Sequence, residues 1–99
     1  MPGLLLVLTE REGARAAAAL ETAAAMAALG RPVAVLLKGA DFADCPALRT
    51  LRELGAELGA CQAAMAQAGV TAADLPPGTT PSGLVAFLAG RADWQLLVA

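Results

Sequence analysis

Two cysteines are the side chains in this sequence best suited to covalent chemistry. Cys61 follows a short apolar stretch, residues 58–60, and an alanine-rich helical pattern begins at Gln62. At a strand-to-helix junction, unpaired backbone N–H groups and the helix dipole both favour a reactive thiolate. A buried and inert cysteine is also a common arrangement for this residue type. The sequence position therefore leaves a reactive and a structural interpretation of Cys61 open.

The second cysteine lies in a predicted loop, between Asp44 and Pro46. Cys45 could act as a resolving thiol or as a second relay thiol. The nearby carboxylates of Asp41 and Asp44 disfavour a negative charge on its sulfur. We therefore expect Cys45 to be an incidental loop residue, with the role of second thiol as the alternative.

Other catalytic chemistries lack the residues that they need. The chain contains no histidine, so it has no Ser/His or Cys/His pair, and an ordinary zinc site lacks its ligands. It also has neither a GxGxxG motif nor a Walker A motif, and we expect no metal and no cofactor. Polar side chains near the predicted strand ends are the candidates for the rim of a pocket around Cys61: Thr9, Glu10, Lys38, Asp41, Gln62 and Ser82.

Strand and helix patterns alternate along the chain. Continuous apolar runs predict buried strands, and alanine-rich runs closed by glycine predict helices. Thr80 and Pro81 look like the N-cap and first residue of the last helix. Strands are expected at residues 4–8, 32–37, 56–60 and 94–98, with a very short strand or loop at 78–80, and helices at 14–29, 47–54, 62–68 and 82–89, with one capped helical turn at 71–74.

This alternation predicts an α/β fold: a doubly wound, mostly parallel sheet of four to five strands with helices on both faces. Residues 1–99 show no repeat or linker, so we expect a single domain. In open sheets of this kind, ligands bind beyond the carboxyl ends of the strands. Cys61 is the only strong nucleophile expected at that edge.

Composition narrows the classes of partner and compartment. The net charge is −2 and the seven Lys and Arg residues are scattered, which argues against a nucleic-acid partner. The first apolar run has no basic segment before it, and no uncharged run is long enough for a membrane span. We expect a soluble cytoplasmic protein whose two cysteines are free thiols.

Beyond these residue-level arguments, the chain resembles the DsrE/DsrF-like sulfur-relay family. The resemblance rests on the first two apolar strands, the long alanine-rich helix that ends at Leu29-Gly30, and the tail Gly69-Val70. It also includes LRELGAELGACQAAM at residues 51–65, in which a cysteine is followed closely by a methionine. The resemblance implies a three-layer α/β/α fold and a homo-oligomer, from dimer to hexamer. It also implies a cysteine at the position of Cys61 that accepts sulfane sulfur as a persulfide from a donor and passes it to an acceptor protein.

Two functional hypotheses follow. In the first, Cys61 is the persulfide carrier of a small sulfur-relay protein, which makes the chain a possible sulfurtransferase. In the second, the chain is a non-catalytic oligomeric or small-ligand-binding module, and Cys61 is a packing residue.

Overall fold

Five short strands form one all-parallel sheet in the computed structural model, which describes residues 2–99. The strand order is β4-β3-β2-β1-β5, and each neighbouring pair is parallel. The strands are β1 (Leu4–Leu8), β2 (Val33–Leu37), β3 (Glu57–Cys61), β4 (Thr79–Ser82) and β5 (Gln95–Val98). The predicted α/β class and the parallel sheet are confirmed.

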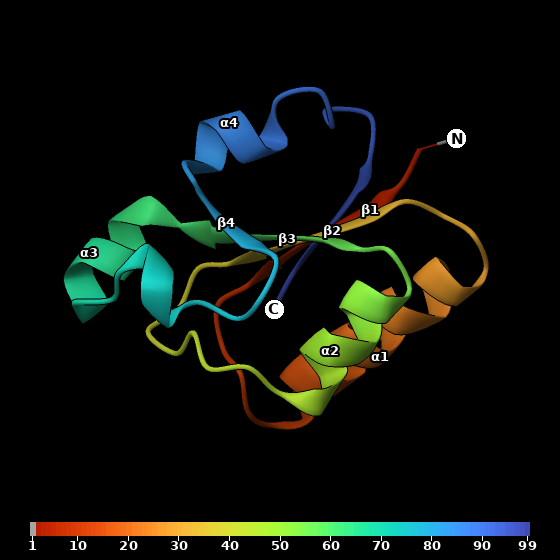
Figure 1. Cartoon of the computed structure of the whole chain (residues 1–99). Helices are drawn as coiled ribbons and strands as arrows, with labels where there is room; N and C mark the ends of the chain where they lie inside the picture. Colours follow the sequence, from red (N-terminus) through yellow and green to blue (C-terminus); the bar gives the residue numbers. More distant parts are fainter. Residues whose placement is uncertain (1) are drawn as a thin grey trace.

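Helices cover the two faces of the sheet unequally (Figure 1). α1 and α2 lie side by side against one face, whereas α4 lies over the other face. The short α3 follows directly from the end of β3. The helices are α1 (Ala14–Ala28), α2 (Pro46–Glu53), α3 (Gln62–Ala68) and α4 (Leu84–Leu88), with a 3₁₀ turn at Ala72–Asp74.

The hydrophobic core is centred on β1 and β2. All five residues of each strand are buried, as expected for central strands that are covered on both faces. The layer below them is filled by small and aliphatic residues of the two long helices, including Ala16, Ala23, Leu48 and Leu51. Alanine on the inner face of α1 therefore lets the helix approach the sheet closely.

The prediction that the last helix starts at residues 80–82 is wrong, whereas the very short strand expected at 78–80 is confirmed in part, as β4. Thr80 and Pro81 do not start a helix but lie in β4, which pairs with β3, and α4 begins only at Leu84. Proline has no N–H to donate, so a strand tolerates it mainly at the edge of a sheet, and β4 is an edge strand. The capped turn at Thr71 and Asp74 is confirmed. The Asp74 carboxylate accepts hydrogen bonds from the backbone N–H and the hydroxyl of Thr71, and the Thr71 side chain accepts one from the backbone N–H of Asp74.

Candidate functional site

One row of side chains crosses four strands at the carboxyl end of the sheet. Cys61, the last residue of β3, pairs in register with Ser82 of β4. The register of β1, β2 and β3, extended by one residue, places Lys38 beside Cys61 and Thr9 beside Lys38. Neighbours in register present their side chains to the same face of a sheet. Four of the residues expected around the site therefore belong to one row: Thr9, Lys38, Cys61 and Ser82.

This row faces the layer that contains α4. Gly59 lies two residues before Cys61 and on the same face of β3, because strand side chains alternate. A Cβ atom on Gly59 would lie 2.5 Å from Cε1 of Phe87 in α4. Glycine at this position lets the aromatic ring pack directly on the backbone of β3. Cys61 consequently sits on the α4 side of the sheet, opposite α1 and α2.

Lys38 is the cation of the site. Its Nζ lies 3.8 Å from Sγ of Cys61, and it is the only lysine in the chain. An ammonium group at this distance stabilises a negative charge on sulfur. Cys61 itself is buried, with 3% of its surface exposed, whereas Lys38 is half-buried. The pair therefore joins a covered thiol to a partly accessible cation.

Two surface hollows meet at Lys38. The first, of about 290 Å³, has no polar wall other than Thr9 and Lys38, and its apolar lining is Val7, Leu84, Leu88, Leu96 and Val98. The second, of about 260 Å³, is lined by Lys38, Gly39 and Ala40 together with Ala64, Gln67 and Ala68 of α3. Lys38 is the residue that they share. A reactant that approaches Cys61 from either hollow would therefore pass Lys38.

The other predicted rim residues have varied positions. The Thr9 hydroxyl donates a hydrogen bond to the carbonyl oxygen of Ala99 at 2.8 Å, and Ser82 Oγ donates to the carbonyl oxygen of Gly83 at 3.1 Å. Gln62 is exposed at the start of α3. Glu10 and Asp41 line another hollow of about 390 Å³ beside Arg11, which Thr9 also borders. The structure thus groups Thr9, Lys38 and Ser82 with Cys61, and places Glu10 and Asp41 elsewhere.

The start of α3 forms no hydrogen bond with the Cys61 side chain. α3 has seven residues, and Cys61 occupies its N-cap position without a side-chain hydrogen bond to the helix. The nearby charge comes from Lys38, which directly follows the neighbouring strand β2 and lies 23 positions away in sequence. Sequence reasoning placed Lys38 at the pocket rim but did not identify its contact with sulfur.

Cys45 has a cationic neighbour that the sequence did not reveal. Nη2 of Arg11 lies 3.4 Å from Cys45 Sγ, and the guanidinium also donates to the carbonyl oxygens of Asp41 and Ala43 at 3.1 and 2.6 Å. These contacts hold the loop before α2 against the end of β1. Arg11 precedes Cys45 by 34 positions, so no local motif links the two residues.

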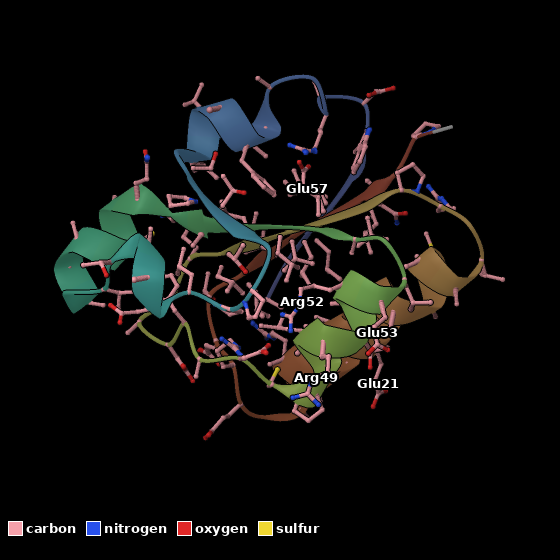
Figure 2. All side chains as sticks on the ribbon, viewed as in Figure 1. Glu21, Arg49, Arg52, Glu53 and Glu57 are labelled. Carbon is pink, nitrogen blue, oxygen red and sulfur yellow. The ribbon has the colours of Figure 1, made fainter. Side chains whose placement is uncertain are left out.

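The carboxylate of Asp44, next to Cys45, forms an ion pair with Arg52. Asp44 accepts two hydrogen bonds from Arg52, at 2.9 and 2.8 Å, and one from the backbone N–H of Cys45. The Arg52 guanidinium holds the pKa of Asp44 below its ordinary value. In Figure 2, Arg52 extends from α2 toward the sheet, whereas Arg49 points outward. The charge of Asp44 is thus directed at Arg52 rather than at the thiol.

Both cysteines are free thiols, and they belong to different faces of the fold. Cys45 lines a hollow between α1 and α2, whereas Cys61 faces the α4 layer. Within residues 2–99, no group of three His, Cys, Asp or Glu side chains is arranged to hold a metal ion. The same part of the chain contains no helix that is long and apolar enough to cross a membrane.

Comparison with known proteins supports the fold alone. No protein-family model matches the chain, and no curated protein matches it. A solved structure, that of the protein of unknown function MTH1491 from Methanobacterium thermoautotrophicum, is similar over the whole of both chains, with a TM-score of 0.73 and 16% sequence identity. The chain therefore shares its complete architecture with a structurally characterised protein.

Proposed function

We propose that this chain is a sulfur carrier that accepts sulfane sulfur as a persulfide on Cys61 and passes it to a partner protein. The observation that carries the proposal is the contact of 3.8 Å between Nζ of Lys38 and Sγ of Cys61. It lies at the carboxyl end of a parallel sheet, where α/β proteins commonly bind ligands. The resemblance to the DsrE/DsrF-like family gives the same position the same role.

The chemistry requires only thiol exchange. The Cys61 thiolate attacks the outer sulfur of a donor persulfide, the donor's S–S bond breaks, and the donor leaves as a thiolate. Cys61 then carries one additional sulfur, whose negative charge Lys38 stabilises. The thiolate of an acceptor protein later attacks that outer sulfur and releases Cys61. No metal or redox cofactor takes part in either transfer.

Because Cys61 is buried, a sulfur donor can reach it only after a local movement of the protein. With 3% of its surface exposed, its sulfur cannot meet a donor until nearby side chains move. Lys38 is half-buried and lines both adjoining hollows, so displacement of its long side chain is the simplest opening. The apolar walls of the larger hollow would shield a bound persulfide from water and from competing thiols.

A second candidate function rests on that same burial. Cys61 lies within the hydrophobic core cluster beside Ala60 and Met65, an environment typical of a structural cysteine. In this case the chain is a non-catalytic binding or oligomeric module. A thiol reagent distinguishes the two candidates: a structural Cys61 reacts only when the protein unfolds, whereas a carrier reacts in the native state.

The decisive experiment measures sulfur loading. Native protein is incubated with a persulfide donor, and its intact mass is determined. We expect one added sulfur on Cys45→Ser, in which Cys61 is the remaining thiol, and peptide mapping of wild type should place an added sulfur on Cys61. Lys38→Met should lower the loading rate by about tenfold, the effect of one lost charge-assisted hydrogen bond. Arg49→Met, which removes an exposed cation from α2, is the matched control. A Cys45→Ser protein that gains no sulfur, or wild type without an added sulfur on Cys61, would exclude the proposal.

We also infer that the chain forms a homo-oligomer through the face that carries α4. Four large apolar side chains are exposed there, with exposed fractions of 37% for Leu84, 83% for Val85, 57% for Leu96 and 58% for Val98. β5 is an edge strand without charge or proline, and such an edge readily pairs with another strand. A second copy would cover both features at once. Sedimentation over a series of protein concentrations measures the mass of the assembly.

A further inference from the structure

We propose that the hollow between α1 and α2 is a second site, at which Cys45 forms a mixed disulfide with a small zwitterionic thiol of the amino-acid or peptide type. The hollow has a volume of about 560 Å³, within the range typical of small-molecule sites. Cys45 and Arg11 lie in its wall. This proposal is independent of sulfur transfer at Cys61.

The first argument concerns the charge beside the sulfur. The Arg11 guanidinium donates to Cys45 Sγ and to two backbone carbonyl oxygens. Its Nε is buried without a hydrogen-bond partner, and within residues 2–99 no carboxylate forms an ion pair with Arg11. The positive charge is therefore free to stabilise a thiolate on Cys45 and to attract the carboxylate of a ligand.

The second argument concerns the walls of the hollow. Small apolar side chains of the two helices line it, among them Ala17, Leu20, Ala24 and Ala47. Glu12 and Glu21 contribute carboxylates to the same lining. A ligand with both an ammonium group and a carboxylate can thus meet acidic side chains and Arg11 within one site. A purely cationic or purely anionic ligand satisfies only one of the two.

The third argument concerns the placement of the thiol. Cys45 is the N-cap of α2 and is half-buried, so its sulfur is more accessible than that of Cys61. Its backbone N–H donates to Oδ1 of Asp44 and its Sγ accepts from Arg11, and both contacts hold Cys45 in place. The Cys45 thiolate would attack one sulfur of a small disulfide, whose S–S bond breaks. The other half leaves as a thiolate and takes a proton from water.

Oxidised glutathione is a suitable probe. Native protein is incubated with increasing concentrations of it, and adducts are located by intact mass and peptide mapping. We expect one glutathionyl group on Cys45, none on Cys45→Ser, and an unchanged adduct on Cys61→Ser. The rate should saturate with concentration, because binding in the hollow precedes the exchange. Arg11→Met should lower the rate by about tenfold.

A cavity-filling variant separates binding from simple thiol reactivity, and it does not disturb the Arg11 hydrogen bonds. Ala17→Phe should slow modification by oxidised glutathione while leaving modification by the much smaller methyl methanethiosulfonate nearly unchanged. Ala18→Phe, on α1 but outside this hollow, should change neither rate. A wild-type rate that stays linear in concentration, or an Ala17→Phe rate equal to wild type, would overturn the proposal. An adduct on Cys61 in place of Cys45 would do the same.

Discussion

Replacing Gly59 with alanine should destabilise the fold through one defined clash. The new Cβ atom would lie 2.5 Å from Cε1 and 2.9 Å from Cδ1 of Phe87. Carbon atoms in contact normally lie about 3.5–4.0 Å apart, so the ring would have to withdraw by about 1 Å. The contact joins β3 to α4, which lies over that face of the sheet.

The surroundings of Phe87 limit how far its ring can retreat. The ring is buried, with 5% of its surface exposed, and the Arg91 guanidinium lies 4.5 Å from its centroid. Arg91 also forms an ion pair with Glu57 of β3, on the α4 side of the sheet (Figure 2). Overpacking of this kind destabilises a fold by about 1–3 kcal/mol. Alanine within a strand is more stable than glycine by roughly 0.5–1 kcal/mol, which offsets part of this loss. The net loss should be about 1–2 kcal/mol.

Urea unfolding at equilibrium measures this loss directly, and thermal unfolding should show a melting temperature lower by about 4–16 °C. Gly83→Ser is the control, because a Cβ at Gly83 meets no atom within 4 Å and serine is favoured at an N-cap. In a Phe87→Leu background the smaller side chain should remove most of the penalty. If Gly59→Ala costs as much with leucine at position 87 as with phenylalanine, the clash is not the cause.

Two further predictions concern the molecular surface and acid stability. Leu96→Lys and Val98→Lys should each weaken self-association in sedimentation by at least about tenfold, since each places a charge in the proposed interface; unchanged association would rule out this face. The pKa of Asp44 is lowered by its hydrogen bonds with Arg52, so the stabilisation is complete above the ordinary value of 3.8 and is lost as the pH falls through the lower folded-state pKa. Asp44→Asn should therefore reduce the free energy of unfolding at neutral pH and converge with wild type in strong acid, whereas a constant difference at every pH would refute this assignment.

The strands and the long helices could be predicted because their signals are local. Residues 4–8 form a continuous apolar run, and a strand covered on both faces needs little else. Pro81 misled the prediction because proline is common both at the first position of a helix and at a sheet edge. Only the pairing of β4 with β3 distinguishes the two, and pairing is a long-range property.

The candidate site was predictable in its position but not in its electrostatics. Cys61 and Lys38 both follow apolar runs, so their place at the carboxyl edge of the sheet follows from the strand pattern. Their contact depends on the register between β2 and β3, which the sequence does not specify. The contact of Arg11 with Cys45 was missed for a similar reason, because it spans two loops that meet only when the sheet has formed.

The two proposals for the α4 face constrain each other. The apolar hollow that reaches Lys38 is lined by Leu84, Leu96 and Val98, which are also the exposed residues of the proposed interface. A second copy seated there would close this route to Cys61 and leave the hollow beside α3, lined by Ala64 and Gln67. Sulfur exchange with a large acceptor protein would then depend on the α3 side, where small residues leave room for an approaching thiol. Under the two proposals, assembly of the chain would therefore select which of the two hollows beside Lys38 leads to Cys61.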